Sequence, residues 1–72
     1  MTIDQCVNQL CDLAKSGESG WLAHVDRIVD DYLAGYGGEI AAKRAELAEK
    51  FALMAPGRER SDQIRERISR PN

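Results

Sequence analysis

The segment from residue 19 to residue 36, SGWLAHVDRIVDDYLAGY, constrains the fold more than any other part of the chain. Its large apolar residues recur at intervals of one or three positions, which places them within an arc of about 140° on a helical wheel. They are Trp21, Leu22, Val25, Ile28, Val29, Tyr32, Leu33 and Tyr36. A strand would require alternation, which this spacing lacks. The pattern predicts a helix over about 20–36 with one face in a core and Ser19 as its N-cap.

Two further segments have the pattern of amphipathic helices. Thr2 and Gln5 have the spacing of a capping box, and the apolar residues that follow them share one arc, which predicts a helix over about 3–15. A third helix is expected over about 39–55, because Pro56 disfavours helical geometry in the residue before it. Its stripe combines the large residues Ile40, Leu47, Phe51 and Met54 with the alanines Ala41, Ala45, Ala48, Ala52 and Ala55.

The last segment, over about 59–69, offers only Ile64 and Ile68 as an apolar pair one turn apart. We therefore expect a short basic helix that packs weakly on the others. The predicted fold class is all-α, a small bundle of three amphipathic helices with this weakly packed C-terminal helix. Residues 1–57 would form the helical core, an antiparallel hairpin of the second and third helices with the first packed on it. Residues 58–72 would form a basic helix or tail.

The glycines of AGYGGEIAAK, residues 34–43, raise the question of a phosphate-binding loop. Such a loop follows a strand, and its lysine comes directly after the last glycine. Here a helical segment leads in, Lys43 lies five positions beyond Gly38, and Glu39 would put a carboxylate where the anion binds. We expect a hinge instead, in which Gly37 or Gly38 adopts the left-handed conformation that closes a helix.

The two cysteines and the single histidine do not form a recognisable chemical site. Cys6 and Cys11 are five positions apart on one helix, so their side chains point about 140° apart and cannot reach each other. With His24 as the only further nitrogen or sulfur ligand, one chain cannot complete a four-ligand zinc set. We expect two buried thiols and a surface histidine, with an intermolecular disulfide or a shared metal as the alternative. No catalytic residue, metal site or cofactor is predicted, and the chain is not expected to be an enzyme.

The charge balance argues against a nucleic-acid partner. A composition with 43% hydrophobic and 31% charged residues is typical of a folded helical domain. Residues 1–37 carry six acidic and two basic side chains, and residues 38–72 carry six acidic and eight basic ones. This basic excess is too small to hold a phosphate backbone by charge. The sequence also lacks an apolar stretch that could span a bilayer and a signal-peptide pattern, so no membrane is expected and a cytoplasmic location is predicted.

Two side chains of the third predicted helix stand out. Arg44 falls inside the apolar stripe, so its charged end must either extend to solvent or find a carboxylate, which could be Asp26 or Asp30 of the neighbouring helix or an acid of a partner protein. Leu53 lies among polar residues, where it could join aromatic side chains in an interface. The arginines of the tail form a solvated face or bind an acidic partner. The predicted partner-binding residues are Trp21, Tyr32, Tyr36, Arg44, Leu53, Arg58, Arg60 and Arg65.

The functional hypothesis follows from the apolar helix faces, which exceed what 72 residues can cover. We expect a protein–protein interaction module that self-associates as a homodimer and regulates, inhibits or helps assemble a larger protein. One alternative is a helix-turn-helix DNA-binding regulator that reads DNA with its third helix, although Glu39, Glu46 and Glu49 would oppose phosphate there. A second alternative is an accessory subunit of an enzyme complex.

Overall fold

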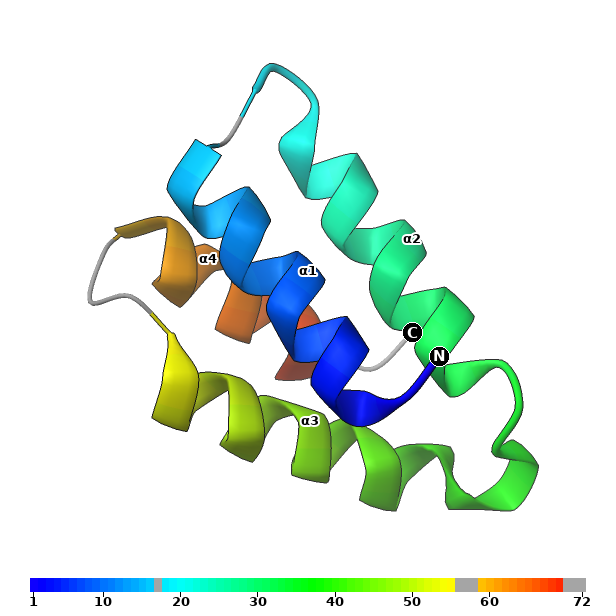
Figure 1. The fold of residues 1–72 in the computed structure, drawn as a ribbon. Coiled ribbons are helices and arrows are strands. Elements are labelled where there is room, and N and C mark those ends of the chain that lie inside the picture. Colours follow the sequence, from blue (N-terminus) through cyan, green and yellow to red (C-terminus); the bar gives the residue numbers. More distant parts are fainter. Residues whose placement is uncertain (17, 56–58, 70–72) are drawn as a thin grey trace.

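The computed structural model describes residues 1–16, 18–55 and 59–69, and these residues contain helices and no strand. Helix α1 spans Ile3–Ser16, α2 spans Trp21–Leu33, the short 3-10 helix η1 spans Gly37–Glu39, α3 spans Ile40–Met54 and α4 spans Glu59–Ser69 (Figure 1). The all-α prediction is therefore confirmed. None of the described helices combines the length and the apolar character needed to cross a bilayer.

The helices pair differently from the predicted hairpin. In Figure 1, α1 and α2 run side by side in opposite directions, α3 crosses below them, and α4 lies behind α1. The closest neighbours are α1 with α2 and α3 with α4, while α2 and α3 contact each other only lightly. The link from 34 to 39 directs α3 away from α2, so the second and third helices diverge instead of packing along their length.

The start of α1 confirms the capping box. The main-chain nitrogen of Gln5 donates to Thr2 Oγ1 at 3.1 Å, and the main-chain nitrogen of Thr2 donates to Gln5 Oε1 at 2.9 Å. These reciprocal bonds satisfy two main-chain amides that have no partner within the helix.

The prediction of Ser19 as the N-cap of α2 is wrong. Gly20 is the residue before the helix, it adopts a left-handed φ of 82°, and no side chain caps this end. The main-chain nitrogen of Trp21 instead donates to the Glu18 carbonyl at 3.0 Å. Glycine reaches this φ without the steric cost that a Cβ would add, so a backbone turn replaces the side-chain cap.

The glycine hinge is confirmed, although α2 ends at Leu33, three residues earlier than predicted. Gly37 has a φ of 55°, the left-handed value expected at such a position. The main-chain nitrogen of Glu39 donates to the Tyr36 carbonyl at 3.0 Å, which closes the turn before α3 begins.

All four helices contribute to the core, and the prediction of a weakly packed C-terminal helix is wrong. Ile64 and Ile68 are both 0% exposed, and Ser61 of the same helix is 3% exposed. Helix α4 contacts each of the other three helices, so its two isoleucines lie where those helices converge. The buried apolar residues are Cys6, Val7, Leu10, Cys11, Ala14, Val25, Val29, Tyr32, Leu33, Leu47, Phe51, Ile64 and Ile68.

Helix α3 buries less of its predicted stripe than expected. Leu47 and Phe51 are fully buried, but Ile40 and Met54, at the two ends of the helix, are 36% and 60% exposed. Of the stripe's alanines, Ala48 and Ala55 are half-buried and pack against the core, and the other three are exposed. Because α3 lies at the edge of the bundle, helices cover it on one side only (Figure 1).

Candidate partner-binding surface

The exposed apolar surface of the molecule is concentrated on α3. Four large apolar side chains are exposed in the described parts of the chain, and three of them belong to this helix. Leu53 is 81% exposed and has the largest exposed fraction of the four. Ile40 and Met54 point to the same side as Leu47 and Phe51 and are exposed because they lie at the two ends of the helix. We call the other exposed apolar residues of this helix the outer face of α3. They are Ala41, Ala42, Ala45, Ala52 and Leu53.

The position of Leu53 follows from the helix repeat. It lies two positions beyond Phe51, so the two side chains point about 160° apart. Phe51 is 0% exposed and points into the core, which turns Leu53 outward. Its placement on the solvent side was predicted from the sequence. The exposure of Ile40 and Met54 was missed, because the pattern could not show that the core ends before the helix does.

Large and small side chains are unevenly distributed along the outer face of α3. Its first half presents only the alanines Ala41, Ala42 and Ala45, whereas the C-terminal half presents Leu53 together with Ala52. The side chains of the outer face therefore protrude further at the C-terminal end of α3 than in its first half. Small side chains allow a neighbouring helix to approach closely, and large ones can fill the space that results.

Charged side chains lie beside this face and within it, because Lys43, Glu46 and Lys50 follow Leu53 around the helix and Glu49 lies between the directions of Ala42 and Ala45. Lys43 Nζ lies 3.7 Å from Glu46 Oε2 one turn away, and it also lies 5.1 Å from the centroid of the Tyr36 ring. Glu49 and Lys50 are exposed, and no ion pair joins either of them to another described residue. Both signs are therefore available beside the apolar residues of α3.

Arg44 contacts α4. It is half-buried, and its Nη1 donates to the main-chain oxygen of Ile68 at 3.1 Å. This carbonyl belongs to the last turn of α4, where main-chain oxygens have no partner within the helix and where a cation is favourable. Asp26, one of the two carboxylates predicted for Arg44, accepts a bond from Arg67 Nη1 at 2.8 Å. Both arginines thus connect α4 to the rest of the bundle.

The predicted aromatic residues belong to α2 and the link that follows it, whereas Leu53 belongs to α3. Tyr32 is only 4% exposed, so it belongs to the core, and its ring centroid lies 5.4 Å from that of Tyr36. Burial, together with the neighbouring Tyr36 hydroxyl, raises the pKa of Tyr32 to about 12. Trp21 is half-buried, and the Arg60 guanidinium carbon lies 5.8 Å from its ring centroid.

The remaining arginines predicted from the tail differ in their surroundings. Arg65 is exposed, and its Nη1 lies 3.8 Å from Oδ1 of Asp62, a still more exposed residue one turn away on α4. Such a pair is typical of a solvated helix surface. Arg58 lies outside the described residues.

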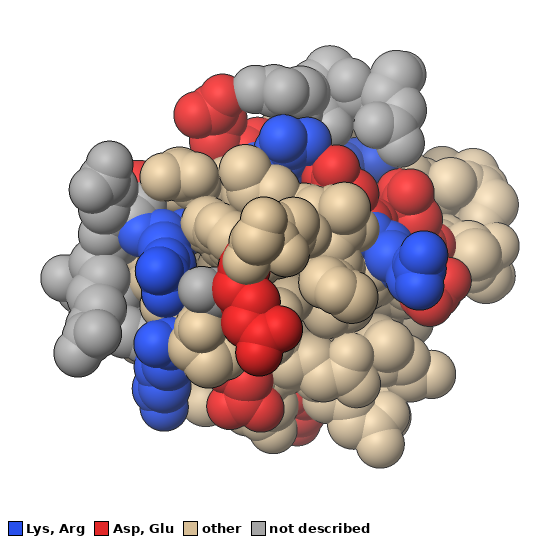
Figure 2. Space-filling view, turned by 90° about the horizontal axis from the view of Figure 1, so that it is seen from above, with Lys and Arg blue, Asp and Glu red and all other residues tan. Residues whose placement is uncertain are grey.

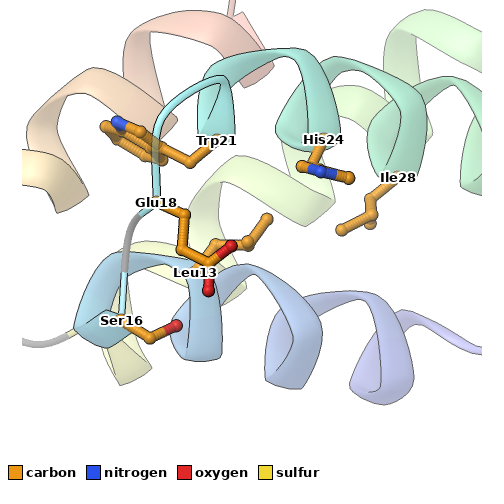
Figure 3. Close-up of a pocket in the computed structure, with 6 residues that line it drawn as sticks. All are labelled: Leu13, Ser16, Glu18, Trp21, His24 and Ile28. Atoms are coloured by element: carbon orange, nitrogen blue, oxygen red, sulfur yellow. The ribbon is translucent and has the colours of Figure 1, made fainter.

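A hollow of about 260 Å³ separates the end of α1 from the first half of α2, and its lining residues are labelled in Figure 3. The Glu18 carboxylate lies between the two helices, near Leu13, while the His24 ring lies near Ile28. The Ser16 hydroxyl donates to the Asp12 carbonyl at 2.8 Å, so it is not directed at the histidine. Within the described residues, no hydrogen bond joins the serine, glutamate and histidine of this hollow. His24 is exposed, as predicted.

The cysteines are free and buried, as predicted. Burial raises the pKa of Cys6 to about 11. Burial also raises the pKa of Cys11, with Lys15 opposing and Asp12 reinforcing the shift. Both thiols are therefore protonated at neutral pH. A protonated thiol is a weak nucleophile and a weak metal ligand. The described residues contain no group of three or more His, Cys, Asp or Glu side chains that could hold a metal ion.

Figure 2 shows the molecule from the side of the link between α1 and α2. Acidic and basic side chains are interspersed among other residues on this view, and neither sign forms a continuous field. This view therefore shows no continuous basic field of the kind that attracts a polyanion from a distance. Comparisons with models of known protein families, with curated proteins and with solved structures find no significant match.

Proposed function

We propose that this chain is a protein-interaction module that binds a protein partner through the outer face of α3 and has no catalytic activity of its own. Its task would be to regulate, inhibit or help assemble that partner. The observation that supports the proposal is the exposure of Leu53, at 81%, on a bundle whose other helices bury their large apolar residues more fully; Met54, at 60%, adds exposed apolar surface at the end of the same helix. Covering a leucine or methionine side chain contributes about 1.5–3 kcal/mol, which a partner surface would gain.

The same helix argues against the DNA-binding alternative. A helix that enters the major groove presents its exposed side chains to bases and phosphates. On α3, those side chains include the carboxylates of Glu46 and Glu49 beside Leu53. Carboxylates repel phosphate, and an exposed leucine gains little from it. A protein surface, which can combine apolar and basic groups, is the better complement. An enzyme to which this chain is an accessory subunit would be one such partner.

The experiment is site-specific photo-cross-linking in the native host. A photoreactive amino acid replaces Leu53 in one variant and Asn8, an exposed residue of α1, in the control variant. We expect position 53 to yield a discrete cross-linked protein and position 8 to yield none. A Leu53→Glu exchange should abolish capture of the same protein by an affinity-tagged chain while leaving the far-ultraviolet circular dichroism unchanged. Equal products from both positions, or none from position 53, would contradict the proposal.

A further inference from the structure

We infer that the hollow between α1 and α2 is a binding site for an arginine side chain of a protein partner. The hollow belongs to two helices that do not carry the outer face of α3, so this inference goes beyond the proposed function. It rests on the size of the hollow, on the chemistry of its walls and on the charges beside it.

The size of the hollow suits one side chain. Its volume is about 260 Å³. Clefts that hold drug-sized molecules have roughly 300–1,000 Å³ and cover most of the ligand. The hollow is also open to solvent, because Ser16, Glu18 and His24 among its lining residues are exposed. A side chain that reaches in from a neighbouring protein surface therefore fits this site better than a free small molecule does.

The walls of the hollow combine an apolar part with an acidic part. Leu13 of α1 and Ile28 of α2 are half-buried and pack against the core, so they offer apolar surface to a side chain that enters. The Glu18 carboxylate lies between the two helices, near Leu13 (Figure 3). An apolar side chain would cover this carboxylate without a hydrogen bond, and an anion would be repelled by it. A cation on an apolar stem complements both parts.

The Glu18 carboxylate is available to such a cation. No ion pair or side-chain hydrogen bond joins it to another residue within the described ranges. The main-chain oxygen of Glu18 accepts from the Trp21 nitrogen at 3.0 Å, which holds the backbone in the turn before α2. The carboxylate therefore extends from a fixed backbone position and keeps its acceptor oxygens for a partner.

The charges beside the hollow also favour a cation. On a regular α1, Asp12 points about 70° from the direction of the lining residues, whereas Lys15 points about 130° from it. On a regular α2, Asp31 points about 50° from the direction of the lining residues, whereas Arg27 points about 90° from it. On both helices the acidic side chain therefore faces the hollow more directly than the basic one does.

Arginine suits these walls better than lysine. Its planar guanidinium donates two parallel hydrogen bonds to one carboxylate, and it is less strongly hydrated than an ammonium group. It also stacks on flat rings, and Trp21 and His24 both line the hollow. The guanidinium carbon of Arg60 already lies 5.8 Å from the centroid of the Trp21 ring. The charge of Arg60 opposes a second cation, so we expect weak binding, in the millimolar range.

The test uses three blocked pentapeptides that differ only in the central residue, which is arginine, lysine or citrulline, the neutral isostere of arginine. Amide shifts in two-dimensional NMR spectra locate the contact, and the fluorescence of Trp21, the only tryptophan of the chain, gives a second signal. The arginine peptide should shift the amides of Leu13, Glu18 and Ile28 most. The citrulline peptide should bind about two- to fivefold more weakly, as expected for the loss of an exposed ion pair, with lysine between them.

Three variants assign the effect to the carboxylate. Glu18→Gln keeps the carbonyl that Trp21 contacts, so the circular dichroism should stay unchanged while the arginine peptide binds as weakly as the citrulline peptide. His24→Glu adds a second carboxylate to the hollow and should strengthen binding of the arginine peptide about two- to fivefold. The control, Asp4→Asn in the first turn of α1, removes the same charge at the far end of that helix and should leave the affinity within about twofold.

Several results would overturn the inference. They are equal affinities of the arginine and citrulline peptides, unchanged binding by Glu18→Gln, amide shifts centred on α3, and no shift in the millimolar range. A lysine peptide that binds more tightly than the arginine peptide would overturn the assignment to arginine. None of these results affects the cross-link expected from Leu53, so this inference and the proposed function fail separately.

Discussion

Replacing Phe51 by alanine tests the assigned core most directly. Phe51 is the largest of the fully buried side chains, with 0% of its surface exposed. Truncating a buried phenylalanine to alanine costs about 3–5 kcal/mol, because apolar contacts are lost and a cavity remains. A domain of this length has a total stability of roughly 4–11 kcal/mol, at about 0.05–0.15 kcal/mol per residue. The variant should therefore lose between about a third of its stability and all of it.

The assay is a thermal melt followed by far-ultraviolet circular dichroism, at a protein concentration low enough to keep the chain monomeric. An unfolding entropy of about 2.1 cal/mol/K per residue converts the expected loss into a Tm lower by about 20–30 °C. The control, Asn8→Ala on the exposed side of α1, should stay within about 0.5 kcal/mol of the parent. Phe51→Asp should abolish the cooperative transition, because a carboxylate would remain in an apolar site. A Phe51→Ala melt within a few degrees of the parent's would refute the packing of α3 described above.

Three further predictions test the hinge, a buried thiol and the contact between α2 and α4. Gly37→Ala should lower the free energy of unfolding by about 1–2 kcal/mol, because φ is 55° at this position, and Gly38→Ala should not. An added Cβ meets no atom at either position, so the two variants differ only in backbone conformation. Equal losses of stability in urea titrations of the two variants would contradict this explanation. The pKa of Cys6 is raised from 9.0 to about 11, so its contribution to stability is complete below pH 9 and decreases as the pH rises toward 11. Between these two pH values the free energy of unfolding should fall by up to about 1.4 kcal/mol per pH unit because of this thiol. The Cys6→Ala variant should lack this part of the pH dependence. A variant whose pH profile matches that of the parent would contradict the prediction. A double-mutant cycle on Asp26 and Arg67 should give a coupling of about 0.2–1 kcal/mol that molar salt reduces, and a coupling insensitive to salt would exclude an ionic origin.

Features that depend on neighbouring residues were predictable from the sequence. The capping box of Thr2 and Gln5 requires only three positions, and its two hydrogen bonds are present. The left-handed conformation of Gly37 follows from a glycine placed between two helical patterns. Leu53 was placed on the solvent side because its angle from Phe51 is fixed by the helix repeat. In each case the interaction that decides the structure lies within a few turns of one segment.

Features that depend on how helices cross were not predictable in this way. Ile64 and Ile68 are too few to mark a strongly amphipathic helix, yet both are 0% exposed because three other helices meet at α4. The carbonyl acceptor of Arg44 and the pairing of Asp26 with Arg67 likewise depend on the crossing of helices distant in the sequence. Tyr32 was expected either in the core or at an interface, and the wheel alone could not distinguish these positions.

The burial of Ile64 and Ile68 also determines when this chain can fold during its synthesis. Helices α1 to α3 are made first, but their shared interior stays open until the ribosome has released the residues up to Ile68. Folding should therefore follow translation of this region instead of accompanying it. Until then the growing polypeptide should leave Phe51 and its neighbours accessible to water.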